Sequence, residues 1–222
     1  MNTREVNMLP KLLPRNINEM IHEEVLNTSR WKIVTNNQPI DKFQFAHNKA
    51  DSGMILCSYE AKDIVEHFPQ TDNNDPSFQK LNFFAEMILD LALQRCRVKT
   101  DFDSWPVFSE VKVLRYFWNY YHRDSIGTWH TDKDDDENAY SLIYYINDAE
   151  NCGTQIIENN GAREEEVMVD QVAGDAVLFP SSFKHAGTSA NSGKHRCNLN
   201  ILFTAREIKN FTQPIKLGEL NE

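Results

Sequence analysis

The second half of the chain is a series of short β-like runs, and this pattern constrains the fold more than any other feature. From Glu110 onward, runs rich in Val, Ile, Tyr, Phe and Thr alternate with turn residues. We expect eight strands there: Val111–Tyr121, Gly127–His130, Tyr140–Asn147, Thr154–Glu158, Val167–Gln171, Ala176–Pro180, Lys184–Thr188 and Arg196–Thr204. Their spacing is typical of an all-β barrel or sandwich.

The first half of the chain carries the helical signals. Asn16 to Leu26 forms one candidate helix, with apolar residues at helical spacing: Ile17, Met20, Ile21, Val25 and Leu26. Asp75-Pro76-Ser77 begins a longer helix, because proline favours the first helical turn. Its broad apolar face is Phe78, Leu81, Phe84, Ala85, Ile88, Leu91 and Ala92. Short strand candidates lie at Trp31–Val34 and Met54–Cys57. The fold class is therefore α+β and mainly β.

The chain is expected to form one compact domain with three parts. Residues 1–105 would support the barrel, residues 106–206 would form the barrel core, and residues 207–222 would form a polar tail.

Composition excludes several classes of protein. Of the 222 residues, 23 are Lys or Arg and 33 are Asp or Glu, which gives a net charge of −10. An acidic chain has no general attraction for nucleic acid or anionic membranes, so neither is expected as a partner. No apolar signal-peptide core and no membrane-length apolar run is found. The four cysteines form no C-x-x-C pair, which favours a reducing, cytoplasmic location without disulfides.

Two H-x-D motifs occur in the β region. His122-Arg123-Asp124 lies in a polar stretch and is interpreted as a hairpin loop. It resembles the catalytic loop of protein kinases, but the required downstream Asn and a glycine-rich loop are absent. His130-Thr131-Asp132 follows the end of a strand. Because residues i and i+2 of an extended segment point to the same side, His130 and Asp132 can aim at one point.

A third metal ligand is available in His185, 53 residues after Asp132. Two His and one carboxylate leave three positions open on an octahedral ion, which is typical of non-haem Fe(II) oxygenases. A structural zinc site would instead fill four positions, usually with Cys, and no Cys lies beside these residues. Asp134 could replace Asp132 as a ligand, although the H-x-D spacing favours Asp132.

Arg196 opens the last expected strand, 11 residues after His185. An Arg inside a barrel needs an anionic partner, because a lone buried charge is costly. A dicarboxylate could supply that partner through the planar guanidinium. The alternative is a surface Arg at a strand end, and Lys194 or His195 could take its place in the motif.

The order H-x-D, a long gap, His and then Arg resembles the Fe(II)- and 2-oxoglutarate-dependent dioxygenases, and most of all their prolyl 4-hydroxylase-like branch. The match covers about Glu110 to Thr204. Four local motifs support it: Ser141–Asn147 (SLIYYIN), Cys152-Gly153-Thr154, Gly174–Pro180 (GDAVLFP) and His185-Ala186-Gly187. The first glycine of the family's G-G-x-T turn is replaced here by Cys152.

The resemblance implies a double-stranded β-helix of eight strands, a jelly-roll or cupin-like barrel with supporting N-terminal helices. It implies that Fe(II) is bound by His130, Asp132 and His185. It further implies that 2-oxoglutarate chelates the iron and pairs with Arg196 through its distal carboxylate. Further cosubstrate contacts implied in this way are Tyr145, Asn200 and Tyr120. O₂ is the other implied reactant, with ascorbate as an optional addition.

The implied activity is hydroxylation of an unactivated C–H bond with release of succinate and CO₂. A prolyl residue of a peptide or protein is the first expected substrate. A free amino acid, another small metabolite and a nucleobase are alternatives. Two rivals are a non-catalytic metal- or ligand-binding barrel, against which Arg196 argues, and another enzyme class on a cupin-like barrel, such as an isomerase or thiol dioxygenase.

Other features receive simpler interpretations. The acidic run at residues 132–137 is expected to be a solvated loop, with a preference for a cationic substrate as the alternative. Core packing is expected for Trp118 and Trp129. Solvent or packing roles are expected for His22, His47 and His67.

Overall fold

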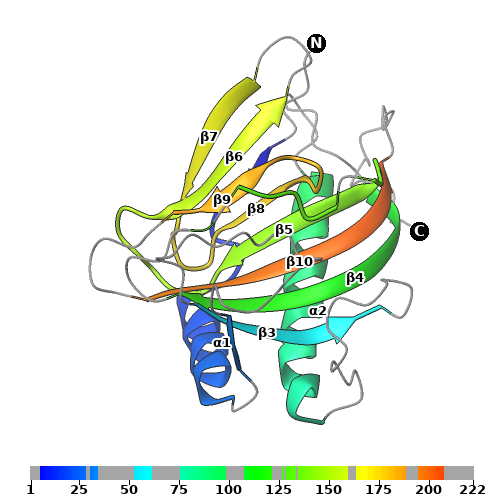
Figure 1. The fold of residues 1–222 in the computed structure, drawn as a ribbon. Helices are drawn as coiled ribbons and strands as arrows, with labels where there is room; N and C mark the ends of the chain where they lie inside the picture. The colour runs from blue at the N-terminus through cyan, green and yellow to red at the C-terminus, as the bar shows by residue number, and fades with distance from the viewer. Residues whose placement is uncertain are drawn as a thin grey trace, which may run out of the picture.

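The computed structural model describes residues 6–28, 31–34, 53–61, 76–98, 108–121, 127, 129–133, 135–159, 164–188 and 195–207. They form two helices and ten strands (Figure 1). In chain order these are β1 Asn7–Leu9, α1 Arg15–Asn27, β2 Lys32–Val34, β3 Gly53–Glu60, α2 Pro76–Val98, β4 Phe108–Tyr121, β5 Ala139–Tyr145, β6 Gly153–Asn159, β7 Glu164–Asp170, β8 Ala176–Pro180, β9 His185–Gly187 and β10 Arg196–Glu207. Several predictions fall outside the described residues: His47, His67, His122, Asp124, Asp134, Lys194 and the tail after Glu207.

Two antiparallel sheets form the barrel. The large sheet has the strand order β1-β8-β5-β10-β4-β3-β2, and the small sheet has the order β7-β6-β9 (Figure 1). A shared apolar cluster joins the sheets, since it contains Ile143 and Phe179 from the large sheet and Ile156 and Val169 from the small one. The expected α+β, mainly β class and its double-stranded β-helix barrel are confirmed.

Strand alternation divides the large sheet into a helix-facing side and a barrel-facing side. On adjacent strands β4 and β10, Trp118 and Leu199 belong to the core beneath the helices. The neighbouring Asn119 and Asn198 point the other way, and the Asn119 Nδ2 donates a hydrogen bond of 3.0 Å to the Asn198 Oδ1. The barrel-facing set therefore comprises Arg115, Phe117, Asn119 and Tyr121 on β4, and Arg196, Asn198 and Asn200 on β10.

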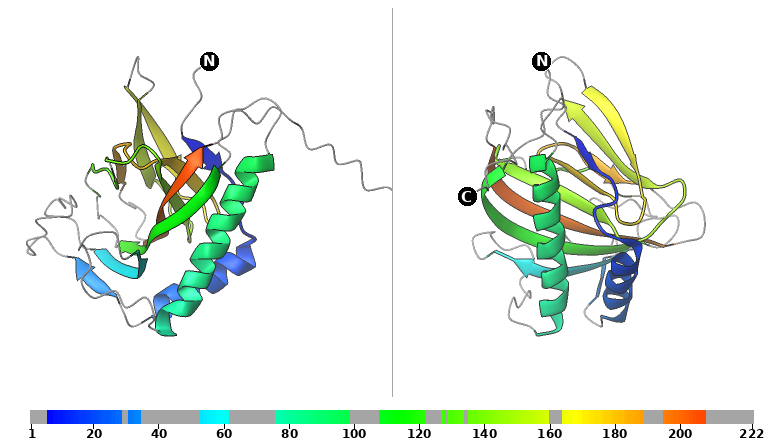
Figure 2. Two further views of the ribbon diagram at one scale, coloured as in Figure 1. Left: turned by 90° about the vertical axis from the view of Figure 1, so that its right-hand side faces the viewer. Right: turned by 180° about the vertical axis from the view of Figure 1, so that it is seen from behind.

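The two helices cover the outer side of the large sheet (Figure 2). Pro76 is the first residue of α2, as expected, and residues such as Leu81, Ala85 and Ile88 pack onto the sheet. In α1 the buried face is narrower than expected, because Met20 is 49% and Leu26 is 44% exposed. Neither described helix is long and apolar enough to cross a membrane.

The exposed fractions of individual side chains test several expectations about the core. The four cysteines are buried, and none takes part in a disulfide. Trp118 is fully buried and donates its Nε1 hydrogen to the Ser58 Oγ, so its core role is confirmed. The same expectation for Trp129 is wrong, because Trp129 is 43% exposed. It directly precedes the inward-facing His130, and adjacent residues of an extended segment point to opposite sides.

Protonation of His22 is expected to destabilise the fold. Its Nε2 lies 2.9 Å from the Nε2 of His195, and burial together with that neighbour lowers the pKa of His22, although Glu23 partly opposes the shift. A lowered pKa means that the unfolded chain binds the proton first, so this stabilisation is lost as pH falls from about 6.5 toward the folded pKa. Urea unfolding at pH 7.5 and 5.5 should show the loss. In His22→Gln the pH dependence should be weaker, and an unchanged dependence would contradict the assignment.

Candidate metal centre

The backbone brings the two halves of the candidate centre together. His130 and His185 form an isolated antiparallel bridge, with N–H···O distances of 3.0 Å and 2.9 Å between their main chains. The Gly127 N–H donates similarly to the Gly187 carbonyl at 2.9 Å. The expected strand Gly127–His130 therefore appears, among the described residues, as this short pairing with β9.

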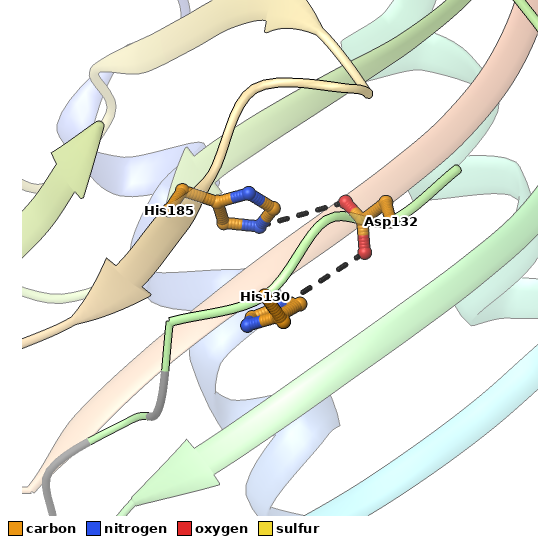
Figure 3. A group of neighbouring side chains, drawn as sticks. All are labelled: His130, Asp132 and His185. Atoms are coloured by element: carbon orange, nitrogen blue, oxygen red, sulfur yellow. Dashed lines mark ion pairs between the residues drawn. The ribbon is translucent and has the colours of Figure 1, made fainter. Parts of the chain in front are cut away.

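Three side chains converge at this bridge (Figure 3). One potential ligand atom from each of His130, Asp132 and His185 lies within 4.8 Å of the other two. His130 Nε2 is 4.0 Å from Asp132 Oδ1, and His185 Nε2 is 3.6 Å from Asp132 Oδ2. The H-x-D spacing acts as expected, because it places the imidazole and the carboxylate on one side of the segment.

The tautomer of His185 suits a metal ligand. Its Nδ1 lies 3.1 Å from the Phe183 carbonyl oxygen, which can only accept, so Nδ1 carries the hydrogen of the neutral ring. Nε2 is then left with a lone pair, and it has no hydrogen-bond partner among the described residues although it is buried. A backbone carbonyl on the second ring nitrogen is the usual way in which a ligating His is oriented. The donor set of two imidazoles and a carboxylate, with one buried lone pair unused, fits Fe(II).

The Asp132 carboxylate is buried and held by three donors. It is 1% exposed, and it accepts from the Ser141 Oγ at 2.6 Å, the Asn200 Nδ2 at 3.1 Å and the Arg115 Nη2 at 3.1 Å. Burial on its own would raise the pKa of Asp132. The nearby His185, Arg115 and His130 and the Ser141 hydrogen bond outweigh that effect and hold the pKa well below its usual range. Asp132 is therefore ionised at neutral pH.

Arg196 is a second charged group inside the barrel. It is 4% exposed. Its Nε donates to the Gln171 Oε1 at 2.7 Å and its Nη2 to the Thr154 Oγ1 at 3.2 Å, and its Cζ lies 5.6 Å from the centre of the Tyr121 ring. No carboxylate of the described residues lies within ion-pair distance of this guanidinium. A buried cation held only by neutral groups is costly, and an anion would offset that cost, so this position is suited to an acidic ligand.

A side chain at Gly187 would disturb Arg196. A Cβ at Gly187 would lie 2.0 Å from the Arg196 Nη1, so Gly187→Ala must displace the guanidinium. We expect the variant to remain folded and to bind 2-oxoglutarate roughly 10-fold more weakly, which corresponds to about 1.4 kcal/mol. Isothermal titration would measure this. Gly187 and Arg196 are in contact, so the losses of binding free energy caused by Gly187→Ala and by an Arg196 substitution should not add in the double variant. Additive losses would contradict an effect of Gly187→Ala through Arg196.

The three other residues predicted to contact the cosubstrate, Tyr145, Asn200 and Tyr120, lie in different parts of the barrel. Tyr145 is fully buried, its hydroxyl donates to the Thr154 Oγ1 at 2.9 Å, and burial raises its pKa to about 12. It thus shares Thr154 with Arg196. Asn200 contacts the metal-site carboxylate. Tyr120 stacks on His195 with ring centres 4.9 Å apart, on the helix-facing side of β4. The next residue, Tyr121, is the tyrosine of this pair that faces Arg196.

Arg115, Ser141 and Gln171 are among the contacting residues that were not anticipated from the sequence. Arg115 and Ser141 hold Asp132, and Gln171 holds Arg196. An Arg among apolar residues of a long strand is a signal that could have identified Arg115, while Gln171 follows a strand end and carries no comparable signal. The acidic run behaves largely as a solvated loop, since Asp135 and Glu137 are exposed and Asp135 pairs with Lys133 at 2.6 Å.

Comparisons with known proteins agree with this geometry. Residues 112–204 match the family model described as the 2OG-Fe(II) oxygenase superfamily. A prolyl-4-hydroxylase from Pseudomonas putida is 16% identical, with 92% of this chain and 94% of that chain covered and a TM-score of 0.55. A Trichoplax adhaerens prolyl hydroxylase, solved with a hypoxia inducible factor peptide fragment, is 15% identical, with coverages of 91% and 84% and a TM-score of 0.61.

A third similar structure comes from a biosynthetic pathway. It is the non-haem α-ketoglutarate-dependent epimerase SnoN from nogalamycin biosynthesis, which is 10% identical, with 91% of this chain and 79% of that chain covered and a TM-score of 0.59. No curated protein matches the chain by sequence. The matched family implies Fe(II), 2-oxoglutarate and O₂, and the His–Asp–His cluster has the donors that such a metal needs. Residues 112–204, which include His130, Asp132, His185 and Arg196, therefore match the Fe(II)- and 2-oxoglutarate-dependent oxygenase superfamily.

Proposed function

We propose that the chain is a 2-oxoglutarate-dependent hydroxylase that modifies a prolyl or other residue of a peptide or protein. Fe(II) would be held by His130, Asp132 and His185, and the distal carboxylate of 2-oxoglutarate by Arg196. The observation that carries the proposal is the buried Nε2 of His185, which has no hydrogen-bond partner among the described residues and lies 3.6 Å from the Asp132 carboxylate. A cation is the group that satisfies both.

The protein's contribution to the reaction is binding and orientation. Arg196 would supply charge and a planar pair of donors to the cosubstrate, with Thr154 and Gln171 fixing the plane of the guanidinium. The Tyr145 hydroxyl would extend this polar wall, and Tyr121 would flank it. Bound Fe(II) would supply the O₂-activating chemistry, so no protein side chain needs to act as a general acid or base.

The roles proposed for Tyr120 and Asn200 differ from the cosubstrate contacts first expected for them. Because Tyr120 lies on the helix-facing side of β4, we propose Tyr121 as the cosubstrate contact instead. Asn200 is proposed to orient Asp132 through its Nδ2, while its buried Oδ1 has no hydrogen-bond partner in the described part of the chain. That oxygen could accept from a bound water or ligand at the centre.

The organisation of the chain supports a single functional unit. We propose that residues 106–206 form the oxygenase core and that residues 1–105 support it, since α1 and α2 pack on the large sheet. A reducing, cytoplasmic location is also proposed, because none of the four buried cysteines takes part in a disulfide.

Modification of a small molecule is the second candidate function. It is favoured by the similarity to SnoN, an epimerase from nogalamycin biosynthesis, at a TM-score comparable to those of the prolyl hydroxylases. The two functions share the metal centre and differ in the groups that contact the primary substrate.

Succinate formation tests the proposed function. Purified protein is incubated with Fe(II), 2-oxoglutarate, ascorbate and O₂, first alone and then with a library of proline-containing peptides. We expect slow succinate release alone and faster release with a peptide that gains the mass of one oxygen atom. Stimulation only by small metabolites would favour the second candidate. No succinate and no binding of 2-oxoglutarate to the Mn(II)-loaded protein would indicate a non-catalytic barrel.

A further inference from the structure

Arg115 lies inside the barrel and contacts the candidate metal centre, although it is not one of the three proposed ligands. Its side chain is 5% exposed, and its Nη2 donates to the Asp132 Oδ1 at 3.1 Å. Its guanidinium carbon sits 3.9 Å from the centre of the Phe117 ring. Asp132 is the carboxylate with which it pairs among the described residues.

The fold places Arg115 at this point through strand register. Arg115 lies opposite Leu202 of β10, and Asn200 lies opposite Phe117. Since Arg115, Phe117 and Asn200 all face the barrel, the Arg115 guanidinium and the Asn200 amide reach the same carboxylate from neighbouring strands. Ser141, on the other side of β10, pairs with Leu202 and supplies the third donor.

The three hydrogen-bond donors engage both oxygens of the Asp132 carboxylate. Arg115 occupies Oδ1, whereas Ser141 and Asn200 both occupy Oδ2. With both oxygens engaged, rotation of the carboxylate would break at least one hydrogen bond. A metal ligand gains affinity when it is held in place before the metal arrives, because less freedom is lost on binding.

A purely stabilising role explains Arg115 poorly. Buried ion pairs seldom stabilise a fold more than apolar residues of similar volume would, because both charges lose their hydration. In addition, the buried Nε of Arg115 has no hydrogen-bond partner within the described residues, which carries a further cost. The pair is better explained by what it does to Asp132.

We infer that Arg115 is a positioning residue for the metal centre, which holds the Asp132 carboxylate in a fixed orientation for a divalent metal. The inference rests on the proposed function of the triad. Loss of Arg115 frees the Oδ1 side of the carboxylate, so the carboxylate loses part of its fixed orientation. The repulsion between Arg115 and the metal acts in the opposite sense. Because Arg115 contacts the carboxylate directly, its effect on Asp132 is expected to outweigh this repulsion, so weaker metal binding is expected overall.

The test is metal binding by the apoprotein, measured by calorimetry with Mn(II) and by the visible spectrum of the Co(II) complex. Arg115→Gln and Arg115→Met are expected to weaken Mn(II) binding by roughly 10- to 100-fold. Arg115→Lys keeps the charge but not the planar donor group, so its affinity should be intermediate and its Co(II) spectrum altered. Arg206→Met is the matched control, since Arg206 lies on β10 with a side chain 74% exposed.

The outcomes separate this inference from the proposed function. Wild-type affinity in all three Arg115 variants, or tighter binding, would overturn the positioning role alone. Failure of the wild-type protein to bind Mn(II) or Co(II) would overturn the proposed function and this inference with it. If Arg115→Met fails to fold by circular dichroism, the charge-preserving Arg115→Lys variant decides, because a merely structural role would leave its Co(II) spectrum unchanged.

Discussion

His185→Ala is expected to abolish specific binding of divalent metal. The substitution removes one of three proposed ligands and leaves Asp132 facing a cavity. Changing a residue that only orients a ligand costs about 10- to 100-fold in metal affinity, so loss of a ligand should cost more than about 100-fold. Succinate formation should fall to the level of a blank without protein.

Thermal unfolding with and without Mn(II) gives a readout that does not depend on activity. A ligand that binds only the folded state stabilises it by about 2.7 kcal/mol at 100 times its Kd. Wild-type protein should therefore melt at a higher temperature with Mn(II), and His185→Ala should show no shift. His22→Ala is the matched control, because it removes an imidazole that contacts His195 and lies outside the triad. A full Mn(II) shift in His185→Ala would remove His185 from the proposed ligand set.

Arg196→Met is expected to give the second largest effect, on binding of 2-oxoglutarate. Removing one partner of a buried, hydrogen-bonded charge pair costs about 2–5 kcal/mol, which corresponds to roughly 30- to 5,000-fold in Kd. The Mn(II) affinity should stay unchanged, because the described contacts of Arg196 are with Gln171, Thr154 and Thr188 and not with the triad. Calorimetric titration of 2-oxoglutarate into the Mn(II)-loaded protein would measure both quantities.

Two further variants sharpen the Arg196 result. Arg196→Lys keeps the charge but cannot offer the planar pair of donors, so it should recover only part of the affinity. Arg206→Met removes an exposed Arg from the other end of β10 and should bind 2-oxoglutarate normally. Equal losses in Arg196→Met and Arg206→Met would indicate a general effect of positive charge and would contradict a specific anion site.

The residues that could be located from the sequence are those defined by local spacing. His130 and Asp132 are two residues apart on an extended segment, and Arg196 begins a strand whose inward positions continue to Asn200. The long helix from Pro76 was equally readable, because its apolar face and its proline start lie within a few turns. Interactions of this kind depend on neighbours along the chain, and a sequence displays those directly.

The local sequence pattern did not determine the register of β4, and therefore not which of its tyrosines faces into the barrel. Tyr120 and Tyr121 are adjacent, and a shift of one residue exchanges the two faces of a strand. The pairing of β4 with β10 places Tyr120 opposite Cys197 and Tyr121 opposite Arg196. Only that long-range pairing puts the Tyr121 ring beside the guanidinium.

The sequence by itself determined the barrel class, the candidate metal-binding motif and the positive charge at Arg196. The tertiary structure alone decided which residues support these groups. Arg115, Ser141 and Gln171 are separated from the residues they hold by 17, 9 and 25 positions and come from different strands and turns. The physical reason is that hydrogen bonds to a buried carboxylate or guanidinium depend on strand register and side-chain direction, which arise only when the sheets assemble.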